Sequence, residues 1–194
     1  WTDMSSREQR PINPWGHGSG GGPPAGQKYR FNWNSPIVFS PHDKTTVYLP
    51  GNVVFRSDDF GKTWTQISND LTTNDPEKLK DAGGPVAIEN TGAEYHSTII
   101  SIAESPVQKD QIWVGTDDGN LQLTVDGGKN WSNIARNVSG VGANSPVSHV
   151  EPSRTGANTA YVAFDRHMFD DFRPYIFKTT DGGKNWTSIS GNLP

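Results

Sequence analysis

The stretch TTDGGKNW, at residues 179–186, occurs three times in this chain of 194 residues. Residues 124–131 repeat it closely as TVDGGKNW, and residues 57–64 form a looser copy, SDDFGKTW. All three copies share the pattern Ser/Thr-x-Asp-x-Gly-Lys-x-Trp. A repeated supersecondary unit indicates an architecture in which each unit buries its apolar face against a neighbouring unit.

The residue types in this motif are those of a tight turn between two strands. Glycine adopts the positive φ that such a turn demands, and the Asp carboxylate and Ser/Thr hydroxyl accept hydrogen bonds from turn amides. The tryptophan begins the returning strand and offers a large apolar face to a neighbouring layer. We therefore expect structural roles for the main positions of the three boxes, which are Ser57, Asp59, Gly61 and Trp64, then Thr124, Asp126, Gly128 and Trp131, and finally Thr179, Asp181, Gly183 and Trp186.

The repeat extends upstream and downstream of the motif. An aromatic residue, Tyr48, Trp113 or Tyr161, lies eleven positions after the first residue of each unit, inside a short run with strand character. The residues after each motif alternate as in a strand with one buried face. Each unit thus predicts four antiparallel strands, and such units arranged radially form a β-propeller.

The predicted fold class is all-β, a β-propeller segment of three four-stranded blades over residues 29–194. The blades are expected at about residues 31–70, 97–136 and 147–191. Residues 1–28 contain no periodic apolar pattern and a run of Gly and Pro, which predicts an irregular arm or loop.

Composition narrows the classes of partner. The net charge of −4 and the pI near 5.7 give no basis for binding nucleic acid or an anionic membrane surface. No apolar run approaches the roughly 18 residues of a membrane-spanning helix. The chain has no Cys, which excludes disulfides and thiolate metal sites. Its 21 Gly, 14 Pro and seven Trp are typical of many short strands joined by turns.

The chain resembles the Asp-box, or bacterial neuraminidase repeat, β-propellers. Besides the boxes, the resemblance rests on YRFNWN at 29–34, IAESP at 102–106, WVGTDDG at 113–119 and DDFRPY at 170–175. The long-range pattern is similar to sortilin-like propellers and to large exported bacterial proteins labelled glycosyl hydrolases. The resemblance implies that the boxes are structural turns at the outer rim, and that the protein is secreted, periplasmic or on the cell surface, most simply of a bacterium.

Two stretches are candidate ligand sites. Glu94 and His96 precede the innermost predicted strand of the second blade, so their side chains could face the central channel, although a solvated loop end is an equal alternative. The second stretch is a long loop in the third blade, with Asp165, His167, Asp170, Asp171 and Arg173. These side chains could bind a cation or polar ligand, or Asp–Arg pairs could simply hold the loop.

No metal-ligand spacing of His residues is present, so neither a metal site nor a cofactor is predicted, and calcium at the long loop is the one alternative. For function we expect a non-catalytic scaffold or a protein- or glycan-binding module. The alternative is a glycoside hydrolase of the Asp-box type, sialidase-like or xyloglucanase-like, which would need two suitably spaced carboxylates. No arginine triad of the sialidase kind is recognisable, which favours the non-catalytic reading; if the protein is an enzyme, we expect a glycoside hydrolase.

Three blades are too few to close a propeller, which usually has about four to eight. An incomplete ring would leave the faces of its first and last blades bare. We therefore expect the partners to be remaining blades of the parent polypeptide or other protein chains, with a glycan as a further possible ligand.

Overall fold

The computed structural model describes residues 1–15, 22–84, 86–92 and 95–193. It confirms the predicted fold class, because its strands form three four-stranded antiparallel sheets with consecutive strands adjacent. Blade 1 comprises β1 (Val38–Phe39), β2 (Val47–Pro50), β3 (Val54–Ser57) and β4 (Thr65–Gln66). Blade 2 comprises β5 (Ile99–Glu104), β6 (Ile112–Thr116), β7 (Leu121–Thr124) and β8 (Ser132–Asn133). Blade 3 comprises β9 (His149–Pro152), β10 (Ala160–Phe164), β11 (Tyr175–Thr179) and β12 (Thr187–Ser188).

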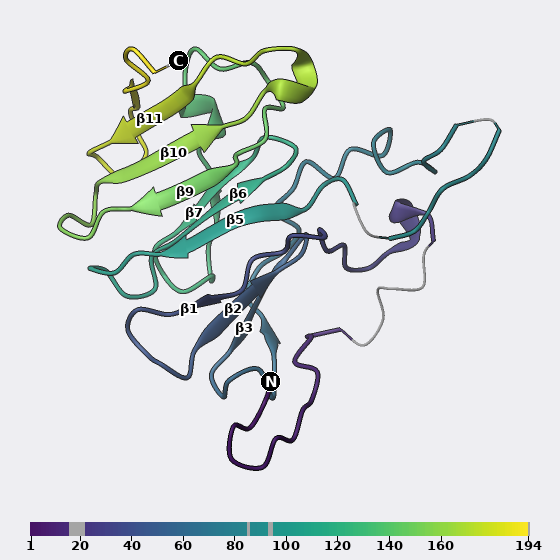
Figure 1. Ribbon diagram of the computed structural model, residues 1–194. Coiled ribbons are helices and arrows are strands. Elements are labelled where there is room, and N and C mark those ends of the chain that lie inside the picture. Colours follow the sequence, from purple (N-terminus) through teal and green to yellow (C-terminus); the bar gives the residue numbers. More distant parts are fainter. Residues whose placement is uncertain (16–21, 85, 93–94, 194) are drawn as a thin grey trace.

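Helical structure in the described residues is limited to three short 3₁₀ turns, η1 (Pro24–Gly26), η2 (Ala135–Asn137) and η3 (His167–Phe169). None of the helices described has the length and apolar character needed to cross a lipid bilayer. Figure 1 shows the three sheets as successive layers, with blade 2 between the other two. The three boxes join the third and fourth strands of their blades.

Each box forms the same hydrogen-bonded turn. In blade 2, Thr124 Oγ1 donates to Asp126 Oδ1 over 2.8 Å and accepts from the Gly128 amide over 3.0 Å. The side chain and amide of Asn130 donate to the Asp126 carboxylate, and these bonds lower the pKa of Asp126 to about 2. Blades 1 and 3 repeat the arrangement, with Ser57 bonding Asp59 and Gly61, and Thr179 bonding Asp181 and Gly183. The carboxylates of the three boxes therefore serve their own turns.

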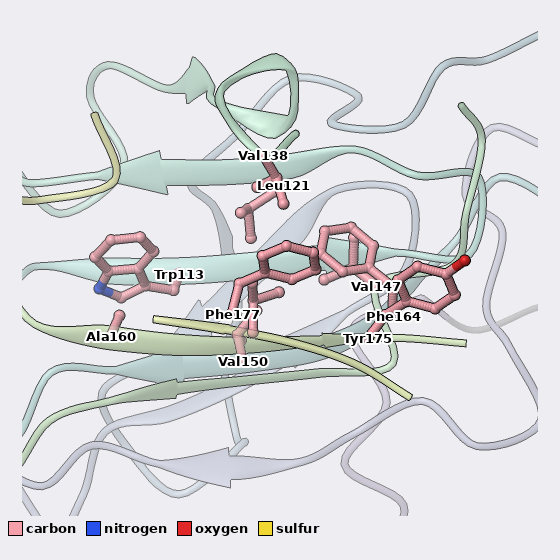
Figure 2. Packing of buried hydrophobic residues seen from close by; sticks show 10 residues of the cluster. Trp113, Leu121, Val138, Val147, Val150, Ala160, Phe164, Tyr175 and Phe177 are labelled. Atoms are coloured by element: carbon pink, nitrogen blue, oxygen red, sulfur yellow. The ribbon is translucent and has the colours of Figure 1, made fainter. Parts of the chain in front are cut away.

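The hydrophobic core lies between the blades. One cluster joins blades 1 and 2 and consists of Tyr48, Val54, Leu71, Ile99, Ile102, Ile112 and Val114. A second cluster joins blades 2 and 3. Its aromatic members are Trp113, Phe164, Tyr175 and Phe177, seen in Figure 2 together with Val147 and Val150. The aromatic residue of the repeat is completely enclosed in the first two blades, where Tyr48 and Trp113 are 1% and 0% exposed. Each blade therefore depends on the next one for burial.

The box of one blade also contacts the residue that directly follows the last strand of the blade before it. The Trp131 indole N–H donates to the Ile67 carbonyl over 3.1 Å, from blade 2 to blade 1. A Cβ atom placed on Gly128 would lie 2.5 Å from that same carbonyl oxygen. In blade 3, a Cβ atom on Gly183 would lie 2.5 Å from Ile134 Cδ1. The second glycine of the box is therefore required by packing as well as by its positive φ, which is +96° at Gly128.

The first blade is partly covered by the amino-terminal arm, whereas the sequence predicted two bare terminal faces. The Trp64 indole N–H donates to the Ile12 carbonyl over 2.6 Å, and a Cβ atom on Gly61 would lie 3.1 Å from Ile12 Cβ. Further along the arm, Trp15 packs edge-to-face on Tyr29 with ring centroids 4.9 Å apart. The arm therefore packs on the box of blade 1, although it is not itself a regular strand.

Candidate functional site

The candidate residues fall in two separate places. Glu94 lies outside the described residues, whereas His96 is described and lies just before β5 of blade 2. The other five, Asp165, His167, Asp170, Asp171 and Arg173, all lie in the connection between β10 and β11 of blade 3. The two groups therefore belong to different blades and are considered in turn.

His96 is paired with a carboxylate that the sequence reasoning did not select. His96 Nδ1 lies 3.8 Å from Asp117 Oδ2. Sheet register explains the pairing, because β5 and β6 are antiparallel with Ile99 opposite Thr116. This register brings Thr98, the residue before β5, beside Asp117, the residue after β6, and His96 lies two residues before Thr98. The side chain of His96 is 37% exposed and that of Asp117 is 16% exposed. The imidazole is therefore accessible to solvent, whereas the carboxyl group beside it is mostly buried.

Asp117 is held in place by Thr98. The Thr98 amide donates to Asp117 Oδ1 over 2.8 Å, and Thr98 Oγ1 donates to Asp117 Oδ2 over 3.1 Å. Burial opposes the charged form of the carboxylate and raises the pKa of Asp117 to about 6, although the Thr98 hydrogen bonds and the nearby His96 act in the opposite direction. A carboxyl group with this pKa can bind or release a proton near neutral pH.

The residue between His96 and Thr98 is strained. Ser97 has a φ of +60°, a left-handed conformation that is unfavourable for a residue other than glycine, and it is fully buried. Its hydroxyl has no hydrogen-bond partner in the part of the chain that the structure describes. Its carbonyl accepts from Arg30 Nε over 3.2 Å, and Arg30 forms a 2.7 Å ion pair with Asp70. Backbone strain supported by surrounding structure is often found at functional sites.

The next carboxylate is already engaged. Asp118 is 3% exposed and accepts hydrogen bonds from the Thr73 amide and hydroxyl, at 2.8 and 2.7 Å, and from Thr116 Oγ1 at 2.6 Å. It therefore ties blade 2 to the segment that follows blade 1, and leaves Asp117 and His96 as the pair that could contact a ligand.

In the blade 3 loop, Asp171 organises the surrounding side chains. It accepts from Arg166 Nε at 3.1 Å, from Arg173 through two bonds of 2.8 Å, and from the Tyr175 hydroxyl at 2.7 Å. The hydrogen bonds from Arg173 contribute most to holding the pKa of Asp171 far below its ordinary value. This geometry supports the alternative in which Asp–Arg pairs hold the loop.

The remaining loop residues form local contacts. Asp165 Oδ2 lies 2.7 Å from His167 Nδ1, and Asp170 has a φ of +57° and donates its amide to the His167 carbonyl at the end of η3. Within the described ranges, no group of three or more His, Asp or Glu side chains is placed to hold a metal ion. Calcium at this loop stays a prediction.

Asp117 and Ser97 are the members of the site that sequence reasoning missed. Asp117 stood in WVGTDDG, a stretch quoted only for its family resemblance, and nothing in its spacing links it to His96 twenty-one positions earlier. The strand register between β5 and β6 is the signal that would have joined them, and it depends on a bulge between Ile99 and Ser101.

The Asp171 cluster predicts a difference between two neutral substitutions. Asp171→Asn leaves Arg166 and Arg173 without a carboxylate, whereas Asp165→Asn breaks one exposed pair with His167. The decrease in melting temperature should therefore be several times larger for Asp171→Asn than for Asp165→Asn. Thermal unfolding followed by circular dichroism measures both variants. Equal losses would show that Asp171 does not hold the loop.

Asp117 predicts a pH dependence of stability. The pKa of Asp117 is about 6 in the folded protein, above the ordinary value of 3.8. The protonated carboxyl group therefore stabilises the fold fully below about pH 4, and this stabilisation is lost as the pH rises to about 6. Asn does not ionise, so Asp117→Asn should keep the same stability across this range. The free energy of unfolding of the variant, relative to that of the wild type, should therefore increase by up to about 3 kcal/mol between pH 4 and 7. Urea unfolding at several pH values measures this change, and a constant difference across the range would contradict it.

The comparison with known proteins begins with the repeat motif. The BNR/Asp-box repeat family model matches residues 55–66, which hold the box of blade 1. Among curated proteins, the chain is 24% identical over 176 residues to a probable oligoxyloglucan-reducing end-specific xyloglucanase of Neosartorya fischeri. That alignment covers 80% of this chain and 17% of the relative, so the chain spans about a sixth of the relative's length.

Two solved structures show the same fold. An ancestral GH74 enzyme matches with a TM-score of 0.57 and 18% identity, covering 92% of this chain and 19% of that one. YCF48 from Cyanidioschyzon merolae matches with a TM-score of 0.51 and 22% identity, covering 82% of this chain and 39% of that one. The chain is therefore a three-blade segment of β-propeller fold that carries the BNR/Asp-box repeat.

Proposed function

We propose that this segment is a non-catalytic part of a larger Asp-box propeller, in which it acts as scaffold and presents the His96–Asp117 pair to a hydroxyl-rich ligand, a glycan. The observation that carries the proposal is the 3.8 Å pair itself, which lies beside the first strand of the middle blade and is reached from solvent through the imidazole. Imidazole and carboxyl groups donate and accept hydrogen bonds, as binding of sugar hydroxyls requires.

The state of the other carboxylates supports this choice. Asp59, Asp126 and Asp181 are occupied by their own turns, and Asp171 is surrounded by arginine and tyrosine donors. A group that already accepts several intramolecular bonds gains little from a ligand and loses those bonds on rearrangement. Asp117 also accepts two hydrogen bonds, both from Thr98, but burial raises its pKa and the exposed imidazole of His96 lies beside it.

One observation favours hydrolysis as a second candidate. The pKa of Asp117, raised to about 6, is suited to a general acid, which must be protonated near the working pH. The similarity to a probable xyloglucanase suggests the bond to be cleaved, a glycosidic bond in xyloglucan. A hydrolase also needs a second carboxylate at a distance that selects retention or inversion, and in this proposal it would come from another part of the propeller.

The partners and location expected from the resemblance remain part of the proposal. The exposed surface of blade 3 and the small share of each relative that is covered support contacts with further blades. Export from the cytoplasm is proposed on the family resemblance.

Titration of xyloglucan oligosaccharides, followed by NMR at the His96 imidazole and by assay of new reducing ends, separates the two functions. We expect a shift at His96 without cleavage, and at least tenfold weaker binding in His96→Ala. His149→Ala, which removes an exposed histidine on β9, is the matched control and should bind as the wild type does. Cleavage that is lost in Asp117→Asn would favour the hydrolase, and no shift at His96 would overturn the glycan site.

A further inference from the structure

The segment YRFNWN, which leads into blade 1, is anchored through most of its side chains. The Tyr29 ring packs edge-to-face on Phe55, with ring centroids 5.0 Å apart, and Phe31 stacks on the same ring. Arg30 is 4% exposed, and its Nε donates to the Ser97 carbonyl of blade 2 over 3.2 Å. The backbone of this segment is therefore held between blades 1 and 2.

Asn32, the fourth residue of the segment, closes a turn and joins it to blade 2. Its Nδ2 donates to Thr98 Oγ1 over 3.4 Å. Its Oδ1 accepts from the Asn34 amide over 3.0 Å, and its carbonyl accepts from the Ser35 amide and hydroxyl over 3.1 and 2.9 Å. An Asn side chain that bonds the backbone two residues on is typical of a tight turn. Trp33 therefore lies at the corner of a turn that is fixed at both ends.

The side chain of Trp33 does not share the burial of its neighbours, because it is 75% exposed. An indole offers one of the largest apolar surfaces of any side chain, and its burial normally stabilises a fold. Here the fold holds the backbone on both sides of the residue and leaves the ring in solvent. An aromatic ring on a fixed backbone loses little conformational entropy on binding, which suits Trp33 for contact with a ligand.

The same hydrogen bonds place Trp33 near the His96–Asp117 pair. Thr98 Oγ1, which accepts from the Asn32 side chain, donates to Asp117 Oδ2 over 3.1 Å. Two hydrogen bonds and one peptide unit therefore separate Trp33 from Asp117. In addition, Trp33 precedes β1 as His96 precedes β5, and these are the first strands of adjacent blades.

We propose that Trp33 is a further binding residue of the glycan site, where its indole packs against the ring face of a sugar whose hydroxyls bond to His96 and Asp117. This role of Trp33 rests on the proposed glycan function of that pair and adds blade 1 to the site. A pyranose ring offers both surfaces, with C–H bonds on its faces and hydroxyls around its edge. An aromatic contact combined with a few well-placed polar groups is the usual composition of a small-molecule site. The glycan therefore binds across the junction of blades 1 and 2 and not on blade 2 alone.

Blade 1 offers a matched control, a second exposed aromatic residue at the other end of its sheet. Phe60 is 42% exposed and lies in the box that follows β3, whereas Trp33 precedes β1. Because β1, β2 and β3 are successive antiparallel strands, the start of β1 and the end of β3 lie at opposite ends of the sheet. Loss of Phe60 therefore removes an exposed aromatic ring away from the proposed site.

Isothermal titration calorimetry with xyloglucan oligosaccharides measures the affinity of the native polypeptide and its variants. Trp33→Ala should weaken binding by about tenfold or more, as truncation of a central tryptophan commonly does. Trp33→Phe, which keeps an aromatic face, should retain most of the affinity, and Phe60→Ala should bind as the wild type does. The melting temperature of Trp33→Ala should match that of the wild type, because the side chain is exposed.

Three results would overturn the role of Trp33. Wild-type affinity in Trp33→Ala, together with loss of binding in His96→Ala, would remove Trp33 from the site and leave the His96–Asp117 pair intact. Equal weakening in Trp33→Ala and Trp33→Phe would show that the aromatic face is not what the ligand contacts. Absence of binding in the wild type would overturn the proposed glycan function and the role of Trp33 together.

Discussion

The structure depends on one steric constraint, the approach of an isoleucine in one blade to a glycine in the box of the next. At Gly128 the Ile67 carbonyl oxygen would lie 2.5 Å from any Cβ, a contact that no other residue type permits without movement. The turn hydrogen bonds of the box present this glycine at the correct place, with Thr124 Oγ1 fixing the Gly128 amide. Local turn chemistry and the packing of neighbouring blades are therefore satisfied by the same residues.

The most conspicuous acidic residues have structural roles and are therefore not the best functional candidates. The box carboxylates stabilise turns that position the blades, and Asp171 performs a similar task for a long loop through Arg166, Arg173 and Tyr175. What remains is a polar site built at the ends of β5 and β6, where sheet register, rather than proximity in sequence, brings His96 to Asp117. The scaffold thus determines which titratable groups stay available for a ligand.

The fold was predictable from the sequence because the repeat depends on local interactions. The glycines, hydroxyls and tryptophans of the boxes indicate turns, and the regular positions of Tyr48, Trp113 and Tyr161 indicate the strands. The site was only partly predictable. His96 was selected from its place before a strand, but Asp117 required the register across a bulge. The packing of Ile12 on the box of blade 1 could not be predicted, because a single contact from an irregular arm produces no periodic pattern in the sequence.

The central claim is that the second glycine of the box is required by the contact between blades and not only by its backbone conformation. Gly128 and Gly140 have similar φ values, +96° and +87°, but a Cβ on Gly140 would meet nothing within 4 Å. Gly140→Ala should therefore cost about 1 kcal/mol for conformation alone, and Gly128→Ala about 2 kcal/mol or more beyond that. Urea unfolding of the two variants measures the difference, and equal losses of stability would contradict the account.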